Sequence, residues 1–489
     1  MKRNASFKTI IIVTLMAAPV VSTGSTLDTL LDRIDLSGYF RVRMWDIAGR
    51  TYVPDTLPSR HGYKNINYLD LFLRSRINLA IIPEIEIRTV FDISSLFGKG
   101  SSSIDSGKGD FIVRDVYALF RPVNGSELSI GLLPFSLPGG YIIARDATGI
   151  QYSHHFPKIK TSLYAGYIRA FDNADDSFGH ESDMPEYVMD NVLFLGSRFS
   201  IGSIISGEAY YVFEDDRYTT NRLTLRSLNF RYDRTAGGFM IDTFDPDRAL
   251  EGDGRKVSLH WLGLHWKIMS GRWFLRFGGI FNTGIIRIRN ELYLFRRVRI
   301  MAGLFECEAG FDNRDLQFSL IAEGATGDPD RPHAGISFQQ IKGSHDFSLI
   351  AVDSTGGLAL RGSGKSQWYG LYGCGVKARY TVLDSLIMEM KLLHFGTTKV
   401  MYWRGRGTTW FGDEVDISAE YRFRNILSVF LTAGGFLPQR AYNAQRKMSN
   451  SHWGYFSEFE TDLILRDLDN YSSKSMIFEF MVGMKVSFD

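Results

Sequence analysis

The stretch DLSGYFRVRMW at residues 35–45 alternates in polarity from one residue to the next. Leu36, Phe40 and Met44 fall on one side of an extended chain, and Arg41 and Arg43 fall on the other side. A charge at every second position is unfavourable where that face packs into a protein core, and it is expected where the face meets water. We therefore interpret the stretch as a strand with one apolar face and one wet face.

The same alternation recurs along the whole chain. It repeats in residues 67–79, 85–93, 272–282, 301–312, 386–392, 414–424 and 476–488. Many of these segments have about ten residues, the length with which a tilted strand crosses a bilayer. The alternative is a soluble sandwich of two sheets, which would also alternate.

The connections between these segments favour a membrane barrel over the sandwich. Short ones at 83–84, 122–125, 269–271 and 424–425 alternate with long ones at 48–66, 95–109, 172–186, 327–346 and 439–471. We expect an all-β fold, a transmembrane antiparallel up-and-down barrel of about 18 strands (range about 16–20), with short periplasmic turns and long extracellular loops.

Composition and charge exclude several other classes. The 489 residues include 36 Phe, 23 Tyr, 8 Trp and 48 Gly but 13 Pro, which suits many strands joined by glycine-containing turns. Lys and Arg number 56 against 54 Asp and Glu, so nothing indicates a nucleic-acid partner. Two cysteines cannot build a disulfide framework or a cysteine zinc site. No apolar run is long enough for an inner-membrane helix.

The first residues have the three-part layout of a secretory signal. Lys2, Arg3 and Lys8 precede the apolar run 9–21. The small residues Ser22, Thr23 and Gly24 follow it and suit a cleavage site after Gly24. We predict a signal peptide at 1–24, cleaved on export, and one barrel domain at 25–489. The expected location is the outer membrane of a Gram-negative-type envelope.

The wet faces supply the candidate site, a pore lined by charges. Its basic residues are Arg41, Arg43, Arg74, Arg76, Arg88 and Arg276, and its acidic residues are Glu306, Glu308, Glu389, Glu414, Asp416 and Glu420. In one interpretation these charges satisfy each other and hold the wall. In the other, the early arginines offer planar donors to carboxylates and form a track for anions.

Nothing in the sequence points to catalysis, a metal or a cofactor. His154 and His155 are adjacent, which puts them on opposite faces of a strand. A hydrolase would need Ser385 close to His394, and on one strand the two lie too far apart. Cys307 and Cys374 are expected to be free thiols on separate strands. Aromatic residues near strand ends, Trp261 and Phe411 among them, are expected in membrane-interface girdles.

Short motifs resemble the alginate-export family of outer-membrane porins. Residues 411–417 (FGDEVDI) and 427–438 (LSVFLTAGGFLP) resemble two strands of that family, through Gly412, Glu414, Asp416, Gly435 and Pro438. Residues 74–79 and 322–328 resemble two others. The resemblance implies a monomeric barrel of about 18 strands that passes solutes across the outer membrane. The founding exporter of that family moves a polyuronate through an arginine-lined lumen.

The expected function is passive transport of small solutes or an anionic oligosaccharide or polysaccharide across the outer membrane. The partners are outer-membrane lipid and the assembly machinery, which would recognise the last strand near Phe488. One alternative is a plugged barrel whose long loops bind a surface partner, with 439–471 as the loop to test. The other is an outer-membrane hydrolase.

Overall fold

The computed structural model describes residues 33–48, 66–97, 110–169, 190–216, 230–233, 238–241, 256–289, 295–327, 336, 338, 347, 370–403, 406–424, 426–439 and 476–488. The predicted signal peptide at 1–24 and the loop after residue 439 lie outside the described residues.

The described residues form strands and one short 3-10 helix, η3. The elements are β1 (Ile34–Ala48), β2 (Ile66–Ile82), β3 (Ile85–Phe97), β4 (Asp110–Phe120), β5 (Ser126–Ser136), η3 (Pro138–Gly140), β6 (Ala144–Phe156), β7 (Thr161–Arg169), β8 (Asp190–Ile201), β9 (Ile205–Asp216), β10 (Phe230–Asp233), β11 (Gly238–Ile241), β12 (Lys256–Ser270), β13 (Trp273–Arg289), β14 (Phe295–Asn313), β15 (Leu316–Ala325), β16 (Leu371–Leu383), β17 (Leu386–Trp403), β18 (Arg406–Phe423), β19 (Leu427–Pro438) and β20 (Ile477–Phe488).

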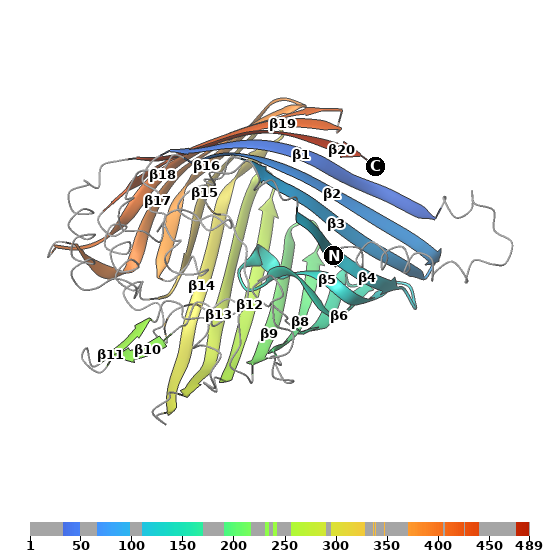
Figure 1. The fold of residues 1–489 in the computed structure, drawn as a ribbon, viewed down its shortest axis with the longest axis horizontal. Helices are drawn as coiled ribbons and strands as arrows, with labels where there is room; N and C mark the ends of the chain where they lie inside the picture. Colours follow the sequence, from blue (N-terminus) through green and yellow to red (C-terminus); the bar gives the residue numbers. More distant parts are fainter. Residues whose placement is uncertain are drawn as a thin grey trace, which may run out of the picture.

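Eighteen of the strands close into one antiparallel barrel (Figure 1). Each strand of the barrel pairs with the next one along the chain, and β1 pairs with both β2 and β20. The blue and red strands of Figure 1 therefore lie side by side at the seam. The remaining two strands, β10 and β11, form a separate hairpin in the connection from β9 to β12. The predicted antiparallel barrel of 18 strands is confirmed.

Tight turns join the strands at one end of the barrel. Gly125, Gly202 and Gly271 have positive φ angles in these turns, and so do Lys160 and Arg424 with φ of 48° and 50°. The opposite end carries the longer connections, although β13 to β14 spans only 290–294 and β17 to β18 only 404–405. We call these the turn end and the loop end.

The outward face of the wall is apolar over most of the circumference. Large exposed side chains there include Leu36, Phe40, Met44, Leu195, Leu262, Phe305, Leu320, Met388 and Leu431. A soluble protein rarely exposes a continuous apolar surface of this extent, whereas a bilayer requires one. No helix among the described residues is both long and apolar enough to cross a membrane.

This assignment of faces predicts opposite results for two adjacent substitutions on β19. Leu431 is exposed on the outward face, and Thr432 points inwards. Leu431→Arg should lower the free energy of unfolding by about 2–4 kcal/mol, since arginine on the lipid face is costly near the bilayer midplane. Thr432→Arg serves as the matched control and should cost much less. Denaturant unfolding in lipid vesicles measures both, and equal losses would contradict the assignment.

Candidate functional site

Two arginines of β1 meet one buried aspartate of β2 on the inner wall. The register pairs Arg43 with Asp70, and Arg43 Nε donates to Asp70 Oδ2 at 2.8 Å. Arg41 Nη2 lies 3.6 Å from the same carboxylate oxygen. The two predicted pore-lining arginines therefore share one counter-charge on the neighbouring strand.

A second buried aspartate, Asp92 of β3, holds two more arginines. Arg74 of β2 makes a bidentate pair with it, at 2.7 Å from Nε to Oδ1 and 2.8 Å from Nη2 to Oδ2. Arg114 Nε donates to Asp92 Oδ2 at 2.6 Å, and its Nη1 donates to Asp146 of β6 at 3.0 Å. Such planar, charge-assisted pairs fix orientation as well as charge.

A break in strand register brings Arg114, which was not among the predicted pore-lining residues, to the inner wall. Val90 pairs with Asp115, but the next residue, Phe91, pairs with Val113, so Arg114 is an extra residue in β4. A bulge of this kind re-aims a side chain that simple alternation would place on the other face. The sequence contains no signal for this shift.

Aromatic rings lie between the arginines on the same wall. The Tyr39 and Phe72 rings stack with centroids 5.7 Å apart and an interplanar angle of 28°. The guanidinium carbons of Arg41 and Arg74 lie 4.8 Å and 5.4 Å from the Phe72 centroid. Lys485 of β20 lies 4.3 Å above Tyr39. We call these five residues the basic-aromatic strip.

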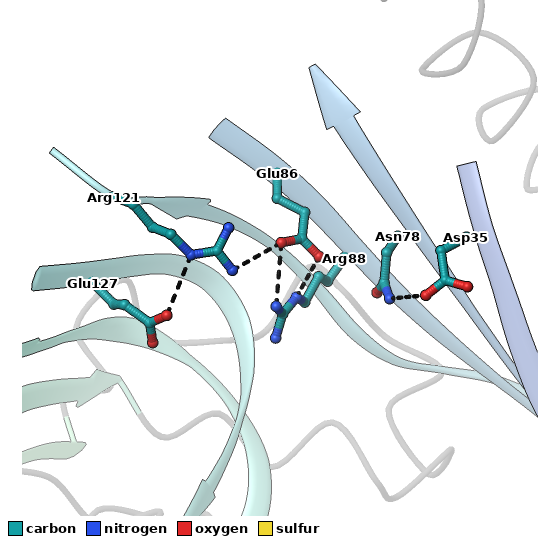
Figure 2. A network of polar contacts seen from close by, with 6 residues as sticks. All are labelled: Asp35, Asn78, Glu86, Arg88, Arg121 and Glu127. Carbon is teal, nitrogen blue, oxygen red and sulfur yellow. Dashed lines mark hydrogen bonds and ion pairs between the residues drawn. The ribbon is translucent and has the colours of Figure 1, made fainter. Parts of the chain in front are cut away.

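Further pairs occupy the turn end of this wall (Figure 2). Glu86 accepts from Arg88 at 2.8 Å and from Arg121 at 3.1 Å, and Arg121 also reaches Glu127 at 3.3 Å. Arg88, a predicted pore-lining residue, is thus neutralised on its own strand. Beside it, Asn78 donates to Asp35 at 3.0 Å.

Arg76 differs from the other predicted arginines. It is exposed on the inner wall, where its register neighbours are Ser37 and Val90, neither of which carries a charge. Among the described residues, no carboxylate lies within ion-pair distance of its guanidinium. Its charge therefore faces the water of the lumen.

The later strands also balance their own charges. Glu308 of β14 pairs with Arg276 of β13 at 2.9 Å and with Lys377 of β16 at 2.5 Å, and it accepts from Ser319 at 2.9 Å. Two predicted residues of opposite sign, Arg276 and Glu308, thereby prove to be partners. The sequence could not show this, because pairing depends on register.

The remaining predicted acidic residues occupy several surroundings. Glu389 lies opposite Arg379 across β16 and β17, and Glu420 pairs with Arg422 at 2.7 Å. Glu414 and Asp416 are buried on the inner side of β18. Beside them, Gly412 lies opposite Pro438, and a side chain at 412 would come within 2.3 Å of the Phe436 ring. Gly435 lies opposite Val415, and a Cβ atom added at 435 would make only ordinary van der Waals contacts.

The β5–β6 connection folds across the lumen and narrows it. Tyr141, just after η3, is fully buried, and its hydroxyl donates to Glu306 Oε2 of β14 at 2.9 Å. Glu306 also contacts His265 Nδ1 at 2.6 Å, whose Nε2 lies 3.1 Å from the Tyr210 hydroxyl. The segment between β5 and β6, teal in Figure 1, is thereby attached to a distant part of the wall.

An inward-facing apolar layer supports this segment, which the sequence analysis did not predict. Many inward side chains of β7 to β14 near the loop end are apolar and buried, and they form one cluster with the end of β5 and the β5–β6 segment. The members used here are Leu133 and Phe135 of β5, Leu137, Ile142 and Ile143 of the segment, and Ile168, Val192, Phe194, Val212, Leu259, Trp261, Ile280, Ile300 and Leu304 of the wall. The Phe135 and Phe194 rings meet edge to face at 5.7 Å.

The burial of two aromatic side chains corrects their assignment from the sequence. Trp261 and Phe411 were expected at the membrane interface, yet both are fully buried. Trp261 lies on the inward face because its neighbour Leu262 is the exposed one. Trp410, next to Phe411, is exposed on the outward face and fits the interface. Polarity alone could not separate a lipid-facing ring from one in an interior core.

The described residues contain no group of three His, Cys, Asp or Glu side chains arranged to hold a metal ion. Cys307 and Cys374 are free thiols on β14 and β16, which β15 separates. His154 and His155 contact different serines, Ser126 at 2.6 Å and Ser162 at 2.9 Å.

Comparisons with known proteins show the fold. No protein-family model and no curated protein matches the sequence. Among solved structures, OccK8 (OprE) of Pseudomonas aeruginosa matches with a TM-score of 0.52 and 11% identity over 93% of this chain and 99% of that chain. OccAB1 of Acinetobacter baumannii matches with a TM-score of 0.52 and 10% identity, over 93% of this chain and 97% of that chain. The outer membrane protein opdK of P. aeruginosa matches with a TM-score of 0.50 and 13% identity, over 93% of this chain and 99% of that chain.

These matches show that the chain shares the closed 18-strand barrel of outer-membrane porin structures. The alginate-export resemblance finds no support among them, so that family stays a proposal.

Proposed function

We propose that the chain is an outer-membrane channel through which small solutes diffuse, with a preference for anions. The closed barrel, its apolar outward face and the fold it shares with the outer membrane protein opdK support this location and role. The observation that carries the anion preference is Arg76, an exposed charge on the inner wall with no ion-pair partner among the described residues.

The paired arginines contribute differently. Asp70, Asp92 and Glu86 each pair with at least one arginine of the predicted basic ladder and offset part of its positive charge, which favours the first of the two interpretations of the wall charges for those residues. A neutralised pair adds little to the average potential of the lumen. The anion track of the second interpretation then depends mainly on Arg76, together with the cations of the basic-aromatic strip.

The narrowing by the β5–β6 segment supports a small solute rather than a large one. The segment is buried against the inner apolar layer and attached at Tyr141. Channel selectivity follows pore width and the charges that line the pore. No catalytic residue is needed for this function, and no cofactor enters it.

An acidic polysaccharide is the second candidate solute. The stack of Tyr39 on Phe72 offers flat apolar faces next to cations, which suits a sugar ring that carries a carboxylate. The resemblance to the alginate-export family favours the same class. Addition of polyuronate to the open channel tests it, because a solute that enters the strip must reduce the current.

Export through a cleaved signal peptide at 1–24, a monomeric state and recognition of the last strand by the assembly machinery belong to the same proposal. That strand, β20, ends at Phe488, and it pairs with β19 and β1 to close the barrel. The alternative of a surface-binding loop depends on 439–471, almost all of which lies outside the described residues.

Reversal of the charge at Arg76 tests the anion preference. A unit charge about 4 Å from an ion in water-like surroundings changes its energy by about 1 kcal/mol, a factor of about five. Arg76→Glu should therefore lower the chloride-to-potassium permeability ratio by at least about fivefold. The measurement is the reversal potential of single channels in a planar bilayer under a salt gradient.

Arg272→Glu provides the matched control, since Arg272 lies in the exposed β12–β13 turn rather than on the inner wall. It should leave the permeability ratio nearly unchanged. Equal shifts in the two variants, or no shift in Arg76→Glu, would overturn the proposed role of Arg76.

A further inference from the structure

Three side chains with complementary chemistry lie in a row on the outward face of β16, β17 and β18. The register places Cys374 directly opposite His394, and His394 directly opposite Asp413. His394 Nδ1 and Asp413 Oδ1 are 2.7 Å apart. A thiol, an imidazole and a carboxylate thus follow one another across three adjacent strands.

The row lies on the side of the wall that faces lipid, close to its loop-end boundary. Met390 and Leu392, which precede His394 on the same face of β17, are exposed. Cys374 lies near the loop-end start of β16 at Leu371. The Trp410 ring, with its centroid 6.1 Å from that of His394, is exposed on the same side. Tryptophan favours the headgroup level, so the row sits at the membrane interface.

All three groups are accessible there. Cys374 is exposed, and the side chains of His394 and Asp413 are 45% and 40% exposed. An amphiphile in the outer part of the bilayer could therefore reach the thiol without passing through the lumen. This separates the row from the proposed pore, whose residues face inwards.

The pair formed by His394 and Asp413 prepares the imidazole to act as a base. A carboxylate at Nδ1 holds the proton on that nitrogen and leaves Nε2 as the acceptor. Residues directly opposite in an antiparallel pair have Cβ atoms about 4.5–5.5 Å apart, so the thiol and the imidazole are neighbours. The final approach of nucleophile to base is commonly looser in a free protein than with substrate bound.

We propose that Cys374 is a nucleophile that accepts acyl groups from ester lipids, with His394 as its base and Asp413 as a positioning residue. Ester carbonyls of membrane lipids lie between headgroup and acyl chain, at the depth where Trp410 places this row. Ser385 is too far from His394 to serve as the nucleophile of the hydrolase alternative, and the register supplies Cys374 in its place.

The chemistry balances with the lipid ester and water as its two reactants. His394 Nε2 takes the thiol proton, the sulfur attacks the ester carbonyl carbon, and the bond from that carbon to the alcohol oxygen breaks. The imidazolium returns the proton to the departing alkoxide. The products are a thioester on Cys374 and a lysolipid. Water activated by the same imidazole then hydrolyses the thioester, which releases a fatty acid and restores the thiol.

The chain contains its own control thiol. Cys307 on β14 lies opposite Phe277 and Ala322, and no imidazole faces it across either strand pair. It shares the outward face and the free state of Cys374. Cysteine chemistry that depends only on a membrane location would appear at both residues, whereas base-assisted chemistry would appear at Cys374 alone.

The test uses the full chain refolded in detergent, with p-nitrophenyl butyrate and dioctanoyl phosphatidylglycerol as acyl donors. Intact-mass and peptide mass spectrometry should find an acyl adduct on Cys374, released by hydroxylamine and absent from Cys374→Ala. His394→Gln should slow its formation by about 100-fold or more, since a general base contributes about 100- to 10,000-fold. Asp413→Asn should slow it by a smaller factor.

A pH series separates a base from a purely structural residue. The rate of Cys374 alkylation by iodoacetamide, in a Cys307→Ala background, should change its pH profile in His394→Gln while the protein keeps its heat-modifiable electrophoretic mobility. No adduct, an adduct on Cys307 in equal amount, or rates and pH profiles unaffected by His394→Gln would each overturn the proposal. Cys374→Ala should leave the single-channel conductance unchanged, because Cys374 is exposed on the outward face and does not line the lumen.

Discussion

Replacement of Asp92 by asparagine should destabilise the barrel more than any other single change on the inner wall. The carboxylate is 1% exposed and holds Arg74 through two bonds of 2.7 Å and 2.8 Å and Arg114 through one of 2.6 Å. An amide cannot offset either positive charge. Loss of one partner from a buried ion pair costs about 3–5 kcal/mol. Here Arg74 loses the carboxylate to which it is bound, and Arg114 keeps only Asp146 among its described ion-pair partners. Denaturant unfolding in lipid vesicles gives the loss directly.

Asp35→Asn is the matched control for this prediction. Asp35 is an exposed aspartate at the turn end of the same wall, with a single bond of 3.0 Å from Asn78 (Figure 2). Asp35→Asn should change the free energy of unfolding by no more than about 0.5 kcal/mol, as ordinary surface substitutions do. Asp92→Asn should also raise the chloride-to-potassium permeability ratio, because it removes a negative charge from the inner wall. If both variants unfold alike, Asp92 does not organise the wall.

Replacement of Tyr141 should release the β5–β6 segment and widen the channel. Tyr141 is fully buried and joins the segment to Glu306 across the lumen. Tyr141→Ala removes the ring and the hydroxyl, and truncation of a large buried aromatic costs about 3–5 kcal/mol. We expect a larger single-channel conductance together with more frequent current fluctuations. Planar-bilayer recordings measure both.

Tyr141→Phe isolates the hydrogen bond from the packing. It keeps the ring and leaves Glu306 without the hydroxyl donor, a loss of about 1–3 kcal/mol. Conductance should rise less than in Tyr141→Ala. Tyr152→Ala removes a tyrosine from the outward face, where the ring is exposed, and should leave conductance unchanged. If Tyr141→Ala conducts like the unchanged protein, the segment does not form the constriction.

The sequence by itself determined the strands, the two faces and the closed barrel. The period of two, read from residues such as Leu36, Phe40, Arg41 and Arg43, depends only on the geometry of an extended chain. A charge at every second position then requires a wet face. Because these features are local, they can be read without knowledge of which strands are neighbours.

Only the tertiary structure decided which charges meet. Arg74 and Asp92 lie 18 residues apart, and Tyr141 and Glu306 lie 165 apart. Arg114 reaches Asp92 through a bulge that the sequence does not announce. Opposite charges on one face show that pairs can form, and the register alone selects the partners.

The inner apolar layer and the row of Cys374, His394 and Asp413 depend on closure in the same way. Trp261 looked like an interface residue, since an apolar side chain on a strand can face lipid or an interior core. The row spans three strands whose alignment is fixed by backbone hydrogen bonds. Local polarity tells which side chains share a face, whereas contacts among distant segments arise only when the sheet has closed and each strand has taken one register.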